Sequence, residues 1–324
     1  MNKDSKILVT GAKGFLGKHV CDELRSREYW NIIECANNTG GDYHIESRTG
    51  TNRCDLRIKH HVESLISYNK PDVVIHLAAR VGGIGANQEN PGAFIYDNLS
   101  MGINLIDACK HSVDKFVLVG TVCSYPKYCP VPFEESRIWD GYPEETNAPY
   151  GIAKKTLTVM LDAYRNQYGL NGITVIPVNM YGPHDDFKPK SSHVIPALIK
   201  KIEEAGEGGE LEIWGTGNAS REFLHVRDSA RGIVMAAESY NQSSPVNLGT
   251  HDEIKISDLV ELLREIMGHK GEVKYNRDKP DGQPRRCLLT AKARQAFGFS
   301  SDIKLKDGLK ETVEWYLSNK GVAV

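Results

Sequence analysis

Short, nearly uninterrupted apolar runs recur along the first half of the chain, and longer stretches with helical spacing separate them. The runs begin at Lys6 (KILVT), Asn31 (NIIEC), Asp72 (DVVIHLA), Lys115 (KFVLVG) and Gly172 (GITVIPV). Strands that are buried on both faces have this character, because helices cover both sides of a parallel sheet. We therefore predict an α/β fold with a doubly wound parallel sheet, which binds its ligand at the carboxyl ends of the strands.

The pattern changes after Val178. The next stretch, NMYGPHDDFKPKSSHVIP, is rich in Pro, Gly and His, and it is followed by a predicted helix at 197–205. We predict a dinucleotide-binding domain over 1–178 and a smaller, mainly substrate-binding domain over 179–324. The apolar run VNLGT, from Val246, is expected to return to the first domain as another strand of its sheet.

A glycine-rich turn directly follows the first apolar run and opens a helix in a GxxGxxG pattern. Glycines let the backbone approach a pyrophosphate closely, and the helix N-terminus favours its negative charge. This placement predicts a Rossmann-type dinucleotide site. The residues predicted to form it are Gly11, Ala12, Lys13, Gly14, Phe15, Leu16 and Gly17.

The second apolar run bears on the choice of dinucleotide. NAD enzymes usually place a carboxylate at the end of this strand to hold the ribose 2′-hydroxyl, whereas a 2′-phosphate prefers a cation. Here the run reads NIIECANN, with Glu34 inside it and no acid directly after it. Lys13, and also Arg48 or Arg53, could meet a 2′-phosphate, so we predict NADP(H). Asp55 would suit the adenine end, although it could equally be a solvated surface carboxylate.

Tyr150 and Lys154 lie four apart at the start of a predicted helix and therefore share one face of it. A nearby ammonium stabilises tyrosinate and lowers the phenol pKa, so that the tyrosine could exchange a proton with a substrate oxygen. The same spacing recurs at Tyr275 and Tyr316, but Tyr150 also lies downstream of a hydroxyl residue, Thr121, that ends the fourth run. That hydroxyl could bind the same carbonyl oxygen, which predicts a proton-transfer site.

These features, in this order, resemble the extended short-chain dehydrogenase/reductase family, and HLAARVGG and REFLHVRD agree with it. Finer motifs resemble one branch, the GDP-L-fucose synthases: VCSYPKYCPVPFEE, NAPYGIAK, NMYGPHDDFKPKSSHVIPAL, WGTGNASREFLHV and KPDGQPRR. The resemblance runs from about Lys6 to the C-terminal region. It implies an NADPH-dependent enzyme that epimerises GDP-4-keto-6-deoxy-D-mannose at C3 and C5 and reduces the C4 ketone.

The resemblance also assigns catalytic roles. Thr121, Tyr150 and Lys154 would be the reductase triad, and Cys123 and His193 would be the epimerisation pair. The chemistry fits, because a ketone at C4 acidifies the C–H bonds at C3 and C5, and epimerisation then needs a base on one face and an acid on the other. Cys123 can be a base only as thiolate, which an imidazole or local backbone dipoles could favour. The alternative for Cys123 is a buried structural thiol.

Further residues are implied in binding. Arg and Lys suit a diphosphate, and the resemblance implies that the GDP-sugar contacts Lys201, Trp214, Arg221, Asp281 and Arg286. The alternative for the charged residues is an ordinary solvated charge, above all for Lys201 on a helix rich in Lys and Glu. The dinucleotide would be lined by Leu56, Ala78, Ala79, Arg80, Gly120, Pro177, Asn179 and Met180, with Tyr150, Lys154 and His193 also in contact.

The composition argues against several classes of partner and site. With 40 basic and 42 acidic residues the formal charge is −2, which gives no case for binding nucleic acid or an acidic membrane surface. No apolar run reaches the roughly 20 residues that span a bilayer, so we expect a cytoplasmic protein. The seven cysteines lack CxxC spacing, so neither a disulfide framework nor a metal site is predicted. The resemblance implies a homodimer through the helices after Asn98 and Tyr150, although their apolar spacing equally permits packing on the sheet.

Three alternatives stay open. The chain could only reduce, or only epimerise, a related 4-keto sugar nucleotide such as a deoxyheptose. It could be a 4-epimerase that keeps NAD bound, although no acid follows the second run. It could also bind NADP(H) without turnover. Such a module would not need Thr121, Cys123, Tyr150, Lys154 and His193 together.

Overall fold

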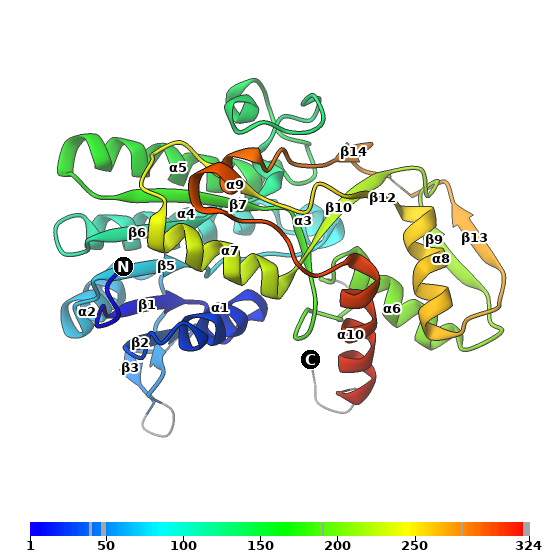
Figure 1. The fold of residues 1–324 in the computed structure, drawn as a ribbon, viewed down its shortest axis with the longest axis horizontal. Helices are drawn as coiled ribbons and strands as arrows, with labels where there is room; N and C mark the ends of the chain where they lie inside the picture. Colours follow the sequence, from blue (N-terminus) through cyan, green and yellow to red (C-terminus); the bar gives the residue numbers. More distant parts are fainter. Residues whose placement is uncertain (39–40, 47–49, 190, 280, 320–324) are drawn as a thin grey trace.

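The computed structural model describes residues 1–38, 41–46, 50–189, 191–279 and 281–319. Within these ranges the chain forms a sheet of eight strands, all parallel apart from β3, which runs antiparallel to β4 at one edge (Figure 1). In spatial order the strands are β11 (Val246–Leu248), β7 (Gly172–Pro177), β6 (Lys115–Val119), β5 (Val73–His76), β1 (Ile7–Thr10), β2 (Ile32–Ala36), β4 (Asn52–Arg53) and β3 (His44–Ile45). Every apolar run named above is a strand of this sheet, which confirms the predicted fold class.

Helices cover both faces of the sheet, as the uninterrupted apolar strands require. In β1, Ile7 and Val9 point into one core and Leu8 points into the other. The helices on the first face are α1 (Phe15–Ser26), α7 (Val226–Ser239) and α9 (Ala291–Phe297), and those on the second are α2 (Lys59–Asn69), α4 (Pro91–Cys109) and α5 (Ala148–Tyr168). The short α3 (Ile84–Glu89), η1 (Val122–Ser124) and η2 (Glu135–Trp139) lie in the connections.

A third hydrophobic core holds the smaller part of the molecule together, to the right in Figure 1. Its helices are α6 (Val194–Ala205), α8 (Ile256–Met267) and α10 (Leu305–Ser318). Its strands are β8 (Asn179–Tyr181), β9 (Leu211–Trp214), β10 (Ser220–His225), β12 (Glu253–Lys255), β13 (Val273–Asn276) and β14 (Arg285–Arg286). Helix α6 begins at Val194 rather than at 197, because His193 occupies its N-cap position and a proline is tolerated in the first turn.

The chain after Val178 does not stay in the smaller part. Strand β11 pairs in parallel with β7, as the run VNLGT predicted. Helix α7 also returns and packs against α1, which the sequence pattern did not predict. The division into domains at residue 178 stays a prediction, but the main sheet and its first helical layer need residues from both sides of it.

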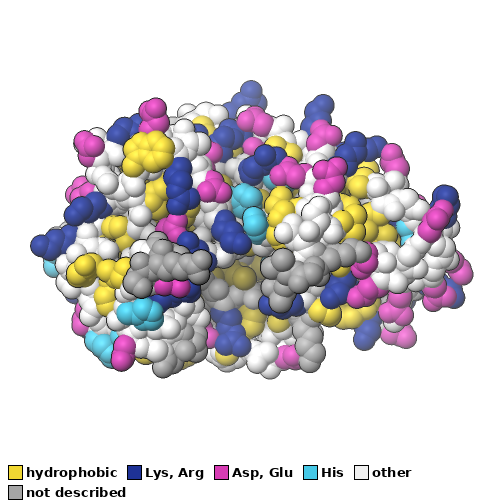
Figure 2. Space-filling model, turned by 90° about the horizontal axis from the view of Figure 1, so that it is seen from below, with side chains coloured by type: hydrophobic (Ala, Val, Ile, Leu, Met, Phe, Trp, Pro, Cys, Tyr) yellow, Lys and Arg dark blue, Asp and Glu magenta, His cyan; other side chains and the backbone are white. Residues whose placement is uncertain are grey.

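Surface features bear on partners. Among the described residues, none of the helices combines the length and the apolar character needed to cross a membrane. Basic and acidic side chains are interspersed over the face shown in Figure 2. On the helices expected to form a dimer, Ile106 and Leu161 belong to the core between α4, α5 and the sheet. Ile103 and Val159 are exposed instead. The homodimer stays a prediction. Its apolar contact surface would include the exposed side chains of Ile103 and Val159.

Candidate active site

A cleft of about 1210 Å³ lies over the carboxyl ends of the main-sheet strands and reaches into the smaller part of the molecule. Among the described residues, all those predicted to bind cofactor or substrate, or to act in catalysis, line this cleft except Ala12. The side chain of Ala12 packs in the core and its backbone N–H donates to the carbonyl oxygen of Cys35, so its contact with the cofactor stays a prediction. The motifs scattered along the chain thus meet in one place.

The glycine turn has the shape that a dinucleotide pyrophosphate requires. Gly11 has a φ of +71°, and a Cβ placed on it would lie 2.9 Å from the backbone nitrogen of Ala78. A Cβ on Gly17 would lie 2.0 Å from the carbonyl oxygen of Gly11. Only glycine allows these approaches, which bring the turn against the end of β5 and leave the N-terminus of α1 open to the cleft. The residues present therefore fit the predicted cofactor.

At the far end of this turn, the charges around β2 suit a 2′-phosphate. Lys13 forms an ion pair with Glu34, which also pairs with Arg25, so two cations neutralise the carboxylate in this strand. Arg53, on β4 directly beside β2, lines the cleft and pairs with Glu46 at 3.2 Å. Arg48 lies outside the described residues. The neighbouring strand thus brings a cation to the position where an acid would select NAD.

Asp55 is only 3% exposed, so its interpretation as a solvated surface carboxylate is wrong. Arg57 donates to both of its oxygens, at 2.9 and 2.7 Å, and these hydrogen bonds lower the pKa of Asp55. Arg57 also donates to Asp97, which accepts in turn from Arg80 at 2.9 Å. Four alternating charges therefore follow the cleft wall. Arg57 and Asp97 were missed by the sequence analysis, because the partners come from three separate segments.

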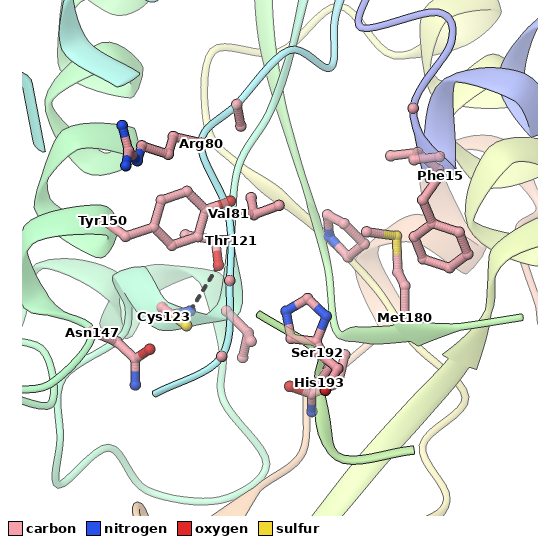
Figure 3. A pocket seen from close by; sticks show the side chains of 18 of the residues that line it. Phe15, Arg80, Val81, Thr121, Cys123, Asn147, Tyr150, Met180, Ser192 and His193 are labelled. Carbon is pink, nitrogen blue, oxygen red and sulfur yellow. Dashed lines mark hydrogen bonds between the residues drawn. The ribbon is translucent and has the colours of Figure 1, made fainter. Parts of the chain in front are cut away.

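The predicted reductase triad lies on one wall of the cleft. Thr121 caps η1 by accepting a hydrogen bond from the backbone N–H of Cys123 at 3.2 Å (Figure 3). Tyr150 and Lys154 project from the beginning of α5, whose first turns pack against η1. Lys154 is only 2% exposed, and burial lowers its pKa from 10.5 to about 8. Its ammonium is therefore held in a largely water-free position.

The expectation that Lys154 lowers the phenol pKa of Tyr150 is wrong for the protein without ligands. Enclosure by protein raises the pKa of Tyr150, the nearby Cys123 raises it further, and a hydrogen bond from Thr121 only partly opposes them. Burial penalises tyrosinate more than the hydrogen bond from Thr121 favours it. Tyr150 therefore carries its proton, which is the form that can donate to a substrate oxygen.

The epimerisation pair spans the cleft. All seven cysteines lie within the described residues; six are buried and Cys123 alone is partly exposed, so its interpretation as a buried structural thiol is wrong. His193 lies across from it (Figure 3). The imidazole is exposed to the open cleft. Desolvation by the surrounding protein lowers the pKa of His193, Asp186 opposes the effect and Arg286 adds to it.

Side chains suited to a nucleotide line the outer part of the cleft. Trp214, at the end of β9, is 54% exposed, and the ammonium groups of Lys201 and Lys279 lie 5.3 and 5.2 Å from its ring centroid. Asp281 accepts two hydrogen bonds from Thr216, at 2.7 and 2.8 Å, and so closes the turn between β9 and β10. This carboxylate shapes the outer cleft around the exposed indole.

The two predicted arginines lie deeper. Arg221 donates to the carbonyl oxygens of Ser220 and Asp281, at 2.7 and 3.2 Å. Burial, together with the positive charge of Arg286, lowers its pKa to about 10. Arg286 is 9% exposed and lies beside Cys123 rather than beside Trp214. Asn147, just before α5, also lines the cleft near Cys123 (Figure 3); the motif NAPYGIAK contained it, but no role was assigned.

The glycine turn, the parallel sheet and the tyrosine–lysine pair define a class. The chain belongs to the NAD dependent epimerase/dehydratase family, whose model matches residues 7–249. It is therefore an enzyme of the extended short-chain dehydrogenase/reductase type, as its motifs predicted.

Particular relatives narrow the class. The chain is 38% identical to GDP-L-fucose synthase 1 of Arabidopsis thaliana over 321 residues, which cover 98% of this chain and 95% of that protein. A solved GDP-L-fucose synthetase from Naegleria fowleri, bound to NADP, matches with a TM-score of 0.86 and 26% identity, covering 100% of this chain and 97% of that one. A GDP-6-OMe-4-keto-L-xylo-heptose reductase from C. jejuni matches with a TM-score of 0.87 and 26% identity, covering 98% and 99%.

Proposed function

We propose that this chain catalyses the NADPH-dependent 3,5-epimerisation and 4-reduction of a GDP-4-keto-6-deoxy sugar. The substrate that the relatives favour is GDP-4-keto-6-deoxy-D-mannose, and the product is GDP-L-fucose. One observation carries the proposal: a single cleft holds Thr121, Tyr150 and Lys154 together with Cys123 and His193. A simple reductase has no need of the second set. The names and coverage of the relatives support the same activity.

In the epimerisation, Cys123 removes a proton from C3 or C5 on one face of the sugar and His193 returns a proton on the other face. The electron pair of the broken C–H bond moves to the C4 oxygen. There the hydroxyls of Thr121 and Tyr150 donate hydrogen bonds to the enolate that forms. Thr121 and Tyr150 lie on the same wall of the cleft as Cys123. The distance between the base and the position of the C4 oxygen is therefore fixed.

In the reduction, NADPH supplies the hydride when it is bound. Tyr150 donates its proton to the C4 oxygen, and the ammonium of Lys154 on the same helix face stabilises the tyrosinate that is left. The raised pKa of the phenol in the free protein keeps this proton in place until substrate arrives. Tyr150 thus serves both half-reactions at the same oxygen.

The GDP moiety would bind between the outer part of the cleft, at Trp214, and the deeper Arg221. In the part of the chain that the structure describes, Arg221 forms no ion pair, so its charge is available to the diphosphate. The exposed indole of Trp214 offers a stacking surface for guanine, flanked by Lys201 and Lys279. A purine base and a diphosphate together account for the mixture of aromatic and basic side chains.

A proton NMR time course in deuterated water, with GDP-4-keto-6-deoxy-D-mannose and NADPH, tests the proposal. We expect deuterium at C3 and C5 and accumulation of GDP-L-fucose. Reduction without deuterium would favour a second candidate, a GDP-linked 4-keto sugar reductase, which the likeness to the C. jejuni heptose reductase supports. No turnover of this substrate, with turnover of a GDP-linked 4-keto heptose, would overturn the choice of hexose.

A further inference from the structure

The proposed epimerisation needs Cys123 as a thiolate, and a specific cation lies at its sulfur. Nη1 of Arg286 is 3.8 Å from Sγ of Cys123. The two residues are far apart in the sequence: Cys123 belongs to η1 after β6, and Arg286 ends β14 in the smaller part of the molecule. Folding therefore brings a guanidinium to the one partly exposed thiol of the chain.

The other partners of Arg286 are neutral. Nη1 lies 3.5 Å from Oδ1 of Asn179, and Nε lies 3.3 Å from Oε1 of Gln283. Within the described residues no carboxylate forms an ion pair with Arg286, although its side chain is almost completely buried. A guanidinium keeps its charge in proteins. A buried positive charge without an acidic partner favours an anion nearby, and the thiol is the group within reach.

His193 is a poor source of the same charge. It directly precedes α6, where the positive end of the helix dipole disfavours imidazolium. Enclosure by protein also lowers the pKa of His193, and Arg286 lowers it further. Substrate filling the cleft would remove the water that still reaches this ring. The helix dipole, desolvation and the charge of Arg286 thus all disfavour an imidazolium–thiolate pair.

Two more titratable groups face Cys123. Tyr150, on α5, stays neutral because its pKa is raised. Arg221, on β10, adds positive charge, but its hydrogen bonds go to the carbonyl groups of Ser220 and Asp281. None of the charged groups that face the thiol from these elements is an acid. The surroundings therefore favour the deprotonated sulfur.

We propose that Arg286 is the counter-ion that holds Cys123 as a thiolate and is thereby a positioning residue for the epimerisation base. The proposal rests on the proposed function for its purpose, but the state of the thiol can be measured without substrate. During epimerisation the thiolate takes a proton from carbon and becomes a thiol, while the electron pair moves to the C4 oxygen. The negative charge thus shifts from sulfur to the enolate inside one cleft, and Arg286 stays close to it.

Alkylation of the full chain with iodoacetamide, from about pH 5 to about pH 10, tests the proposal, with the extent of reaction at Cys123 read by peptide mass spectrometry. We expect the midpoint for Cys123 to lie about one to three pH units below that of free cysteine. Arg286→Gln should raise this midpoint by at least about one unit, which is a tenfold loss of rate at lower pH, and Arg286→Lys should restore most of the shift.

The neighbouring Arg285 provides a matched control. It is exposed on the same strand and pairs with Glu253, so Arg285→Gln should leave the profile of Cys123 unchanged. Binding of NADPH shows that each variant is folded. Identical profiles for Arg286→Gln, Arg285→Gln and the unaltered protein would overturn the proposal. So would a midpoint for unaltered Cys123 equal to that of free cysteine.

The test separates this proposal from the proposed function. A low midpoint that depends on Arg286, without deuterium in the sugar, would overturn the substrate assignment and leave the ion pair standing. Deuterium at C3 and C5, with an alkylation midpoint for Cys123 equal to that of free cysteine in every variant, would support the proposed function and overturn the ion pair. In that case Cys123 would be deprotonated only in the substrate complex.

Discussion

The two sides of the cleft are built in different ways. On the reductive side, Thr121, Tyr150 and Lys154 come from the end of β6 and the start of α5, which pack together on the main sheet. On the epimerising side, Cys123 shares that wall, but His193 and Arg286 are brought from the smaller part of the molecule. Hydride chemistry thus depends on one compact unit, whereas proton transfer at carbon depends on two parts meeting. The two activities should therefore be separable.

The largest effect is expected on the reductive side. Tyr150→Phe removes the proton donor and one enolate hydrogen bond, so kcat should fall about 10²- to 10⁴-fold while the Kd for NADPH stays nearly constant. Initial rates of NADPH consumption and a fluorescence titration measure the two quantities. Tyr164→Phe, on the same helix but bonded to Asp107, is the control and should retain activity. A phenylalanine variant with near-normal kcat would remove Tyr150 from the mechanism.

The next effect belongs to the epimerising side. His193→Gln should reduce deuterium incorporation at C3 and C5 about 10²-fold, because one face of the sugar loses its proton-transfer group. Reduction at C4 should suffer much less, since Thr121, Tyr150 and Lys154 are untouched. Cys123→Ser should show the same division. Equal losses of exchange and reduction in both variants would mean that the two sides do not work separately.

A smaller effect concerns stability, because the reductive side includes a buried charge. Lys154→Met should raise the free energy of unfolding by about 2 kcal/mol near neutral pH, at the expense of activity. The pKa of Lys154 falls from 10.5 to about 8 on folding, so between these values the unfolded chain holds a proton that the folded chain has released. Stability of the unaltered protein therefore rises through this window.

Urea unfolding at about pH 7 and at about pH 9.5 measures this contribution. The advantage of the methionine variant should shrink at the higher pH, because the unaltered lysine is then neutral in the folded state. An advantage that does not change with pH would assign the effect to packing of the methionine instead.

The smallest effect lies outside both sides. Arg53→Gln should raise the KM for NADPH about tenfold and change that for NADH little, because a charged contact to the 2′-phosphate is lost. Once the cofactor is bound, the rates of deuterium exchange and of reduction should both be unchanged. Arg137→Gln, in an exposed ion pair away from the cleft, is the control. Equal changes for both cofactors would assign Arg53 to the structure of the β3–β4 hairpin.

Much of this arrangement follows from local sequence. Continuous apolar runs predict the strands, and glycines at fixed spacing predict the turn, because both depend on neighbours along the chain. Arg57 with Asp97 and Arg286 with Cys123 depend on contacts across the fold, which no local pattern reports. The raised pKa of Tyr150 was also missed, since the sequence shows Lys154 nearby but not how much water the fold excludes.

The return of β11 to the edge of β7 has a consequence for biosynthesis. A chain released only as far as residue 178 has β7 as an unpaired edge strand and the apolar face of α1 without α7. Exposed edges and uncovered helix faces are prone to aggregation. The nucleotide-binding unit therefore cannot be completed on the ribosome before Leu248 has emerged, and the large sheet depends on residues that lie beyond the boundary the sequence pattern marks.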